Sequence, residues 1–342
     1  MKAVCLAVFL IASFGVLSPR VYSHPPHSNY TDAESLLKSE GFIGVFLVKR
    51  DGTDILRKGF GSANVAQKIP NRIDTQYRIG SLSKTLTALA VVQLKNTGKI
   101  PSYDTPVSHF VKDYPRGDEI TLRHLLTHRS GIPEFFNGID HSESFSPLEL
   151  VNLTKFKPLE FEPGEKYSYS NSNYILLGYL IELISGYAYK QYLSQHILEE
   201  LGLDHTGYGE STISQANHAQ GYTTANQAEP ANYIDMSIPY SAGALSSNLA
   251  DLETWSESIA TGSLISAADK EDVFAERGYG FGWVTSTVAG KKVYTQSGGI
   301  YGFSALIVIF PEENHLIIGL SNIEGQQPIL KQLAATIAEN EF

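Results

Sequence analysis

The chain has 342 residues, of which 42% are hydrophobic and 18% charged, and its formal net charge is -10 at pH 7. An acidic chain is a poor partner for polyanions, so the charge argues against binding to nucleic acid or to anionic lipid surfaces. The only cysteine is Cys5, which excludes a disulfide within the chain. Stability must therefore come from a hydrophobic core, and the length suffices for one large domain or two small ones.

The first residues predict a secretory signal peptide. Lys2 precedes an apolar stretch, Ala3–Leu17, and the small-residue sequence Val21–Ser23 offers a cleavage site before His24. The apolar stretch has 15 residues, fewer than the roughly 20 that cross a bilayer. We therefore predict removal of residues 1–23 and a periplasmic or secreted protein without stable membrane insertion. A retained membrane anchor is the alternative.

Patterns typical of strands lie at both ends of the remaining chain. Between Gly41 and Val65, apolar runs flank Asp51-Gly52, a dipeptide typical of tight hairpins. A second strand-rich zone runs from Gly280 to Leu320, and a final amphipathic helix is predicted over Pro328–Glu339. Sequence-distant strands of this kind favour one antiparallel sheet built from both chain ends.

Helical patterns fill the region between these strands. Three helices each end at a glycine, the residue preferred just past a helix carboxyl end: Ser81–Asn96 before Gly98, Asn173–Ser185 before Gly186, and Lys190–Leu201 before Gly202. We predict an α+β fold in a single domain, residues 24–342. Its sheet part comprises about 41–80 and 275–342, and its inserted helical part about 81–270.

Ser81 and Lys84 form a Ser-x-x-Lys motif directly after Gly80, at the head of an apolar run. On a helix, residues three apart share a face, and the first turn lies at the positive end of the helix dipole. The hydroxyl and the amine can therefore meet, as an activated nucleophile requires. The same spacing recurs at Ser35 and Lys38 without the glycine turn or the apolar helix, and we interpret that copy as a surface helix.

Tyr169 is the only tyrosine with an asparagine, Asn171, two residues later. In a turn that leads into a helix, both side chains can face one cleft. A phenol beside the Lys84 ammonium would have a lowered pKa and could share a proton with it. In the alternative interpretation, Asn171 or Ser172 caps the helix and Tyr169 only packs.

A third candidate element, Gln296-Ser297-Gly298-Gly299, follows the predicted strand Val293–Thr295 and precedes another at Phe303–Phe310. Backbone N-H groups on a strand edge can bind an oxygen that becomes anionic. The paired glycines allow a substrate to approach the backbone closely. A bulge or turn between strands is the alternative.

His124 and His128 lie four residues apart on a predicted helix, a spacing that can bind zinc. The glutamate of a metalloprotease helix is absent, so we expect structural roles for both histidines. A serine nucleophile with a lysine base needs neither a metal nor another cofactor, and we predict none.

The three candidate elements, in this order, resemble the Ser-x-x-Lys, Tyr-x-Asn and Lys/His-Thr/Ser-Gly motifs of the serine beta-lactamase-like hydrolases. The branch in question contains class C beta-lactamases, D-alanyl-D-alanine carboxypeptidases, D-aminopeptidases and related esterases. Further stretches resemble the same family: Tyr77–Ser81, Thr121–Pro133, Tyr169–Gly178, Ser241–Leu245 and Gly298–Ser304. The resemblance covers about residues 35–340.

The resemblance implies a beta-lactamase/transpeptidase-like fold and a serine hydrolase that acts through an acyl-enzyme on an ester or amide. Ser81 would be the nucleophile and Lys84 its proton acceptor. Tyr169 would be the general acid and base that also activates the deacylating water, and Asn171 would orient the substrate or the lysine. The backbone N-H groups of Ser81 and Gly299 would bind the oxyanion. The implied partner is a small molecule or a short peptide or ester.

The third motif departs from the family because Gln296 stands where lysine or histidine is usual. Gln296, Ser297 and Gly298 would bind substrate, but glutamine supplies no charge for a substrate carboxylate. We therefore expect poor turnover of beta-lactams and of peptides with a free carboxyl end, and hydrolysis of esters or uncharged amides. A non-catalytic or slowly acylated relative that binds cell-wall peptides or beta-lactams is the alternative. His205–Gly207 also spells the third motif, but we expect it on a loop without a flanking strand.

Overall fold

The computed structural model describes residues 32–342 with the exception of 210–216, 263 and 277. The predicted signal peptide, residues 1–23, lies outside the described residues. Among the helices that are described, none is both long and apolar enough to span a membrane.

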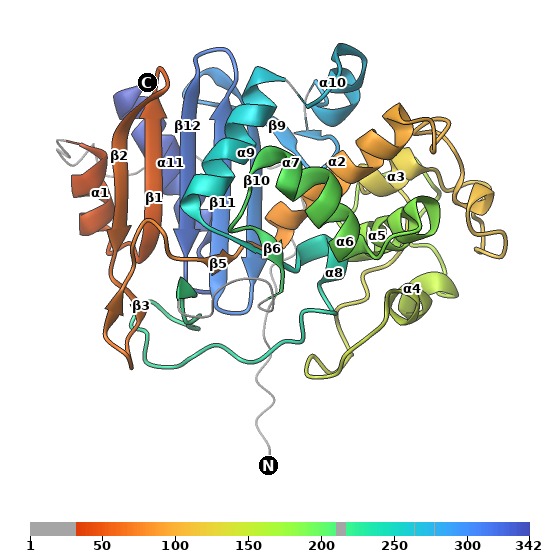
Figure 1. The fold of residues 1–342 in the computed structure, drawn as a ribbon, viewed down its shortest axis with the longest axis horizontal. Coiled ribbons are helices and arrows are strands. Elements are labelled where there is room, and N and C mark those ends of the chain that lie inside the picture. The colour runs from red at the N-terminus through yellow and green to blue at the C-terminus, as the bar shows by residue number, and fades with distance from the viewer. Residues whose placement is uncertain (1–31, 210–216, 263, 277) are drawn as a thin grey trace.

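A seven-stranded antiparallel sheet forms the centre of the fold, and both ends of the chain contribute to it (Figure 1). The strand order is β2-β1-β12-β11-β10-β9-β8. The strands are β1 Gly44–Arg50, β2 Thr53–Phe60, β8 Gly278–Tyr279, β9 Val284–Val288, β10 Lys291–Ile300, β11 Phe303–Phe310 and β12 His315–Ser321. Strand β1 pairs with β12, with Val45 opposite Leu320. The predicted α+β fold, with a sheet built from both chain ends, is confirmed.

Helices and two minor sheets complete the structure. The helices are α1 Ala33–Ser39, α2 Ser83–Asn96, α3 Leu122–Leu126, α4 Pro147–Lys155, α5 Asn171–Ser185, α6 Tyr189–Leu193, α7 Glu199–Leu201, α8 Tyr240–Gly243, α9 Leu249–Thr261, α10 Ala267–Val273 and α11 Gln327–Glu341. Strand β3 Ser62–Asn64 pairs with β4 Ile69–Pro70, and β7 Leu245–Ser247 pairs with β5 Tyr77–Arg78 and β6 Gly207–Tyr208. A π-helical turn, Ser194–Leu198, joins α6 to α7.

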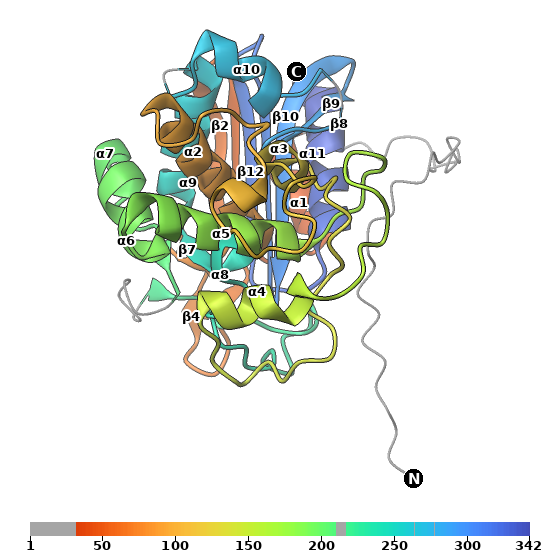
Figure 2. The same ribbon diagram turned by 90° about the vertical axis from the view of Figure 1, so that its right-hand side faces the viewer.

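Each face of the main sheet has its own hydrophobic core. Because side chains alternate along a strand, Leu306 and Val308 of β11 pack with α1 and α11, whereas Ala305 and Ile307 pack toward the other helices. Figure 2 shows α1 and α11 on one side of the sheet and α2, α5 and α9 on the other. Burial on both faces explains the almost continuous apolar sequence of β11 and β12.

The predicted hairpin and most helices are confirmed, with changes at their ends. Asp51 and Gly52 join β1 to β2 with positive φ angles of 51° and 74°, the backbone that an Asp-Gly hairpin turn adopts. Helix α2 begins at Ser83 rather than at residue 81, because Gly80–Leu82 forms a 3-10 turn. Gln296–Gly299 lies inside β10 rather than after a strand, because the ladder with β11 continues through both glycines.

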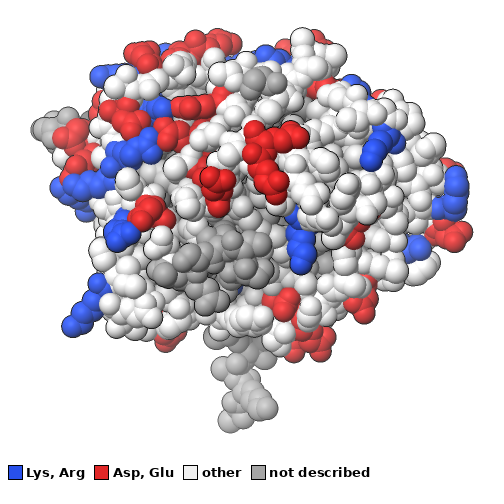
Figure 3. Space-filling view, in the orientation of Figure 1, with Lys and Arg blue, Asp and Glu red and all other residues white. Residues whose placement is uncertain are grey.

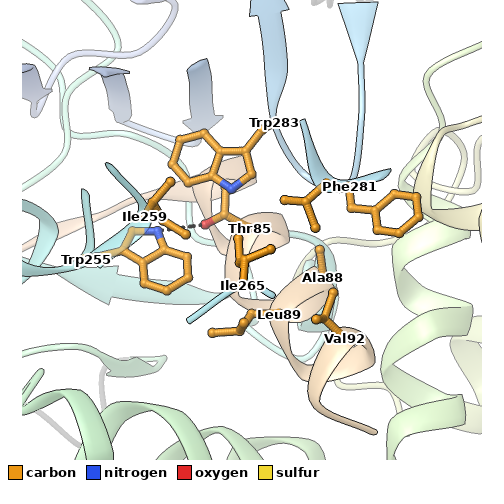
Figure 4. A pocket seen from close by; sticks show the side chains of 10 residues that line it. Thr85, Ala88, Leu89, Val92, Trp255, Ile259, Ile265, Phe281 and Trp283 are labelled. Atoms are coloured by element: carbon orange, nitrogen blue, oxygen red, sulfur yellow. Dashed lines mark hydrogen bonds between the residues drawn. The ribbon is translucent and has the colours of Figure 1, made fainter. Parts of the chain in front are cut away.

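One face of α2, Thr85 to Val92, packs against two tryptophans around a narrow apolar pocket (Figure 4). Trp255 and Trp283 stack with ring centroids 6.4 Å apart, and Trp255 Nε1 donates to Thr85 Oγ1 at 3.2 Å. All the residues that line this pocket are buried. We interpret this pocket as a packing gap, and the core around it holds α2 in place.

Acidic and basic side chains are interspersed on the face shown in Figure 3. Ion pairs join neighbouring elements: Lys49 Nζ lies 2.6 Å from Glu253 and 2.5 Å from Glu257, and Arg57 lies 2.6 Å from Glu253. These ion pairs link β1 and β2 to α9, which crosses in front of the sheet (Figure 1).

Candidate active site

Ser81 lies in the 3-10 turn between β5 and α2, and two side chains lie within hydrogen-bonding distance of its hydroxyl oxygen. Lys84 Nζ is 3.0 Å from Ser81 Oγ, and the Tyr169 hydroxyl donates to the same oxygen at 2.8 Å. The structure therefore brings together three residues that the sequence analysis selected from two separate motifs.

Close contact between glycines fixes the turn against the edge of β10. Gly80 has a φ of +51°, and a Cβ there would lie 2.7 Å from the carbonyl oxygen of Gly299 and 2.8 Å from its nitrogen. A Cβ on Gly298 would lie 1.9 Å from the Ile79 oxygen and 3.0 Å from the Ser81 nitrogen. Side chains at Gly80 and Gly298 are excluded, and the backbone of Gly80 and Ser81 lies beside that of Gly298 and Gly299. Ser81 and Gly299, the two residues predicted to supply oxyanion donors, both line the pocket at this point.

Lys84 is completely buried, and its amine contacts three oxygens. Besides Ser81, Nζ donates to Asn171 Oδ1 at 2.8 Å and to the Ala242 carbonyl at 2.7 Å. Burial lowers the pKa of Lys84 to about 7, although the negative charge of Glu134 opposes this shift. A large fraction of the amine is therefore neutral near pH 7, as a proton acceptor must be.

Tyr169 is held in an apolar setting, and our expectation of a lowered pKa is wrong. Burial raises the pKa of Tyr169, and the hydrogen bond to Ser81 opposes that shift only in part. The Lys84 nitrogen lies 5.0 Å from the centroid of the Tyr169 ring. Desolvation outweighs this nearby amine, so Tyr169 stays protonated and can act as a proton donor.

Asn171 begins α5 and does not cap it. The residue before the helix is Ser170, whose side chain makes no capping bond, so the capping alternative for Asn171 or Ser172 is wrong. The Asn171 amide instead joins Lys84 to Glu134, because Nδ2 donates to Glu134 Oε2 at 3.0 Å. The sequence analysis missed Glu134, since one acidic residue after Pro133 matches no motif.

An aromatic cluster lies behind Tyr169, with His128 at its centre. The His128 and Tyr169 rings are 4.3 Å apart and inclined by 30°, and those of His128 and Tyr279 are 4.6 Å apart and inclined by 73°. His128 Nδ1 accepts from the Ser170 backbone at 3.2 Å. Nε2 is buried and finds no hydrogen-bond partner within the described part of the chain. Burial lowers the pKa of His128 well below its ordinary value, so the ring is neutral.

The two histidines considered for zinc do not share a helix. Helix α3 ends at Leu126, and His128 follows it with a φ of +56°. His124 Nδ1 instead accepts from the Thr121 backbone at 3.3 Å, which caps α3. In the described ranges, no cluster of three or more His, Cys, Asp or Glu side chains could hold a metal ion.

Gln296 points toward the aromatic cluster. The side chain is buried, its Nε2 donates to the Tyr279 hydroxyl at 3.1 Å, and its Oε1 accepts from the Ser297 backbone at 3.0 Å. Gln296, Ser297 and Gly298 do not line the pocket at Ser81, whereas Asn171 and Gly299 do.

That pocket has an apolar wall formed by two separate segments. The lining residues are Gly80, Ser81, Phe135, Phe136, Asn171, Pro239, Ala242, Gly243, Gly299, Ile300 and Tyr301. None of these side chains is charged. His141 links the two segments, because Nδ1 lies 2.6 Å from the Tyr301 hydroxyl and Nε2 lies 3.0 Å from the Phe136 carbonyl.

The two competing motifs lie elsewhere in the fold. Ser35 and Lys38 are on α1, where Lys38 pairs with Glu34 on the exposed face, as the surface-helix interpretation predicts. In His205–Gly207, Gly207 starts β6, so the expected absence of a strand is wrong. Thr206 nevertheless makes a structural contact, because its hydroxyl donates a hydrogen bond to Asp251 at 2.7 Å.

Comparison with known proteins identifies the family. The family model described as "Beta-lactamase" matches residues 32–340, nearly the whole of the described chain. The chain belongs to the beta-lactamase family. This family membership supports a serine hydrolase of the beta-lactamase and penicillin-binding protein type.

Relatives and solved structures agree with membership of the beta-lactamase family. A putative penicillin-binding protein, PbpX of Bacillus subtilis, is 32% identical over 294 residues, which cover 84% of this chain and 73% of that protein. The crystal structure of a penicillin-binding protein from Bacillus halodurans superposes with a TM-score of 0.76 at 25% identity, covering 90% of this chain and 99% of that one. D-amino acid amidase from Ochrobactrum anthropi has the same fold, with a TM-score of 0.80 at 21% identity and coverages of 88% and 94%.

Proposed function

We propose that this protein hydrolyses uncharged esters or amides through an acyl-enzyme on Ser81. The observation that carries the proposal is the pair of hydrogen bonds at Ser81 Oγ, one with Lys84 Nζ at 3.0 Å and one with the Tyr169 hydroxyl at 2.8 Å. A nucleophile in contact with a neutral amine and with a protonated phenol has both a base and an acid within reach.

In the proposed acylation step, Ser81 Oγ bonds to the carbonyl carbon while its proton passes to Lys84. The carbonyl oxygen becomes anionic and is bound by the N-H groups of Ser81 and Gly299. The bond to the leaving alcohol or amine then breaks, and Tyr169 gives that group its proton. This leaves an ester on Ser81, an ammonium on Lys84 and a phenolate on Tyr169.

Deacylation reverses these proton transfers with water as the nucleophile. The Tyr169 phenolate takes a proton from water, and the resulting hydroxide bonds to the acyl carbon. The ester bond to Ser81 then breaks, and Ser81 Oγ recovers its proton from the Lys84 ammonium. The acid is released and all three residues return to their starting protonation states.

The lining of the pocket supports an apolar acyl group. Phe135, Phe136, Ile300 and Tyr301 surround the space beside Ser81, and no lining side chain carries a charge. An apolar pocket with few polar groups favours an apolar ligand, and a free carboxylate would be desolvated there without a partner. D-amino acid amidase, which has the same fold, has been solved with phenylalanine and with phenylalanine amide. Aromatic amides and esters are therefore the first substrates to test.

A covalent probe tests the nucleophile. A fluorophosphonate forms a bond from Ser81 Oγ to phosphorus with loss of fluoride, and mass spectrometry locates the adduct. We expect one adduct on the Ser81 peptide and none in Ser81→Ala, whereas Ser35→Ala, in the second copy of the motif, labels like the parent. Equal labelling of Ser81→Ala and the parent would refute the proposal.

Gln296 favours a second candidate function, a receptor that is acylated but does not turn over. The glutamine supplies no positive charge near Tyr169, and it donates its hydrogen bond to Tyr279 instead. Steady-state hydrolysis of an aromatic ester distinguishes the two functions. A single burst of product equal to the enzyme concentration would indicate the receptor, and continued release indicates the hydrolase.

Export is also part of the proposal. It rests on the apolar stretch Ala3–Leu17 and the cleavage site before His24. Expression of the full chain in a bacterial host, followed by amino-terminal sequencing of the product, tests it. A mature protein that starts at His24 in the periplasm or the medium is expected, and an intact Met1 terminus in the cytoplasm would contradict it.

A further inference from the structure

The side chain of Glu134 accepts four hydrogen bonds at the edge of the site. Oε2 accepts from the Asn171 backbone at 2.7 Å and from Asn171 Nδ2 at 3.0 Å. Oε1 accepts from the backbone N-H groups of Phe135 and Phe136 at 2.9 Å and 3.1 Å. All four partners are donors, so the arrangement requires a group that only accepts, which is a carboxylate.

Glu134 determines which way the Asn171 amide faces. An asparagine amide has one donating and one accepting end, and the carboxylate can bind only the donating end. Oδ1 must therefore face the other way, toward Lys84 Nζ at 2.8 Å. With the Ala242 carbonyl at 2.7 Å, the amine faces two oxygens that can only accept.

These two oxygens orient the neutral amine. A neutral lysine has two N-H donors and one lone pair, and the Asn171 and Ala242 oxygens take both donors. The lone pair is then directed to the third neighbour, Ser81 Oγ at 3.0 Å. We propose that Glu134 is a positioning residue, which fixes the Asn171 amide so that the lone pair of Lys84 meets the Ser81 hydroxyl. This inference rests on the proposed hydrolase function.

The charge of Glu134 also acts on Lys84. The rings of Tyr169 and Tyr174 lie 5.0 Å and 5.6 Å from Nζ, and both phenols are kept protonated by burial. His128 is neutral for the same reason. Glu134 supplies the negative charge that favours the ammonium of Lys84. Removing this charge lowers the pKa of Lys84, so the acid limb of activity moves to lower pH.

Glu134→Gln tests both effects with the rate of fluorophosphonate labelling and with ester kinetics. A glutamine amide has one accepting end, so it can accept from the Asn171 donors or from the Phe135 and Phe136 backbone N-H groups, but not from both pairs. The carboxylate that held the Asn171 amide is lost, and the lone pair of Lys84 loses its fixed direction. We expect kcat and the labelling rate to fall about 30-fold, with KM changed less than about threefold, and the acid limb to move down by about half a pH unit. Glu149→Gln is the matched control, because Glu149 also accepts a backbone N-H bond at a helix start, on α4, but remote from Ser81.

A double-mutant cycle separates positioning from a merely structural role. If Glu134 acts through Asn171, Glu134→Gln costs less than about threefold in kcat in an Asn171→Ala background. Glu134→Asp keeps the charge but shortens the side chain, so kcat falls while the acid limb stays in place. Thermal unfolding of each variant shows whether it is folded. If Glu134→Gln does not fold, Glu134→Asp, alone and in the Asn171→Ala background, replaces it in the test.

The outcomes distinguish this inference from the proposed function. Absence of any adduct on Ser81 in the parent refutes the hydrolase and with it the positioning role. Labelling of the parent and of folded Glu134→Gln at equal rates, with the same acid limb, refutes the positioning role alone. Losses that multiply in the Asn171→Ala background also refute it, because they would show that Glu134 acts independently of Asn171.

Discussion

Ser81 is flanked by two neighbourhoods of opposite character. We define the lysine side as Lys84, Asn171, Glu134 and the Ala242 carbonyl. There each hydrogen-bonding group of the amine and the amide meets a partner of the right kind, and one carboxylate supplies a charge. On the lysine side, the hydrogen bonds therefore determine which atoms donate and which accept.

The tyrosine side consists of Tyr169, His128, Tyr279 and Gln296. Contacts between aromatic rings order it together with isolated hydrogen bonds, and the His128 Nε2 has no partner in the described residues. Burial acts on both sides but with opposite results, because it lowers the pKa of Lys84 and raises the pKa of Tyr169. Near pH 7 the phenol is neutral and a large fraction of the amine is neutral, so burial prepares the amine as a base and the phenol as an acid.

Removing the base should have the largest effect. Lys84→Met keeps the length and apolar packing of the buried side chain but leaves Ser81 without a proton acceptor. We expect kcat/KM for an aromatic ester to fall by about 10³-fold or more. Lys38→Met, in the second copy of the motif, is the control and should retain parent activity. A fall below tenfold in Lys84→Met would show that the lysine side is not the source of the base.

Removing the proton donor, Tyr169, should lower activity less than removing the base and should change which step limits the rate. Tyr169→Phe keeps the ring that stacks on His128 but loses the hydroxyl at Ser81. We expect kcat to fall about 10²-fold and the acyl-enzyme to accumulate, since deacylation needs the phenolate to activate water. Intact-mass spectrometry during turnover measures the acylated fraction. Tyr167→Phe is the control, and an unacylated Tyr169→Phe at steady state would contradict the assignment.

The pH profile should report the lysine side. Lys84 is active as the neutral amine, and its pKa is about 7, so activity falls as the pH falls through 7. We expect about a tenfold lower labelling rate of Ser81 at pH 6 than at pH 8. The unfolded chain holds the Lys84 proton up to its ordinary pKa, so stability should rise with pH between about 7 and 10. A labelling rate that is flat from pH 6 to pH 8 would contradict the lowered pKa.

His128 offers a smaller test of the tyrosine side. Asparagine tolerates the positive φ of this position and its oxygen can still accept from the Ser170 backbone, so His128→Asn removes mainly the stacking ring. We expect kcat to fall threefold to tenfold, with no further loss in a Tyr169→Phe background. His124→Asn is the control for loss of a neighbouring histidine. Equal losses in both backgrounds would mean that His128 supports the fold and not Tyr169.

The sequence predicted the motifs well because local spacing determines them. Ser81 and Lys84 are one turn apart, so any helix start brings them together. The Tyr169 and Asn171 pair was predictable for the same reason. The contacts between the two motifs form only when the sheet and α5 assemble. The order of the motifs and the glycines around them nevertheless indicated the family, and members of the family share that assembly.

Other features depend on burial and on long-range packing, which spacing does not reveal. The direction of the Tyr169 pKa shift was predicted wrongly, because the nearby amine was visible in the sequence and the desolvation was not. Glu134 was missed because its four donors come from two segments that only meet in the folded chain. The Gln296 side chain bonds to Tyr279 and does not line the pocket. This contact depends on the sheet order β10-β9-β8, which brings the two residues together only in the folded chain.

Placing a cation on the tyrosine side should have the smallest effect. Gln296→His restores a residue type usual in the family, but this position is buried and lies outside the pocket lining. A protonated histidine there would attract a substrate carboxylate only over a distance, so we expect about a threefold rise in kcat/KM for a carboxylate-bearing ester relative to its methyl ester at pH 6. Gln332→His, at an exposed position on α11, is the control. An unchanged ratio would mean that the apolar wall of Phe136 and Tyr301, and not the missing cation, excludes carboxylates. In that case Tyr301→Lys should raise the ratio although Gln296→His did not.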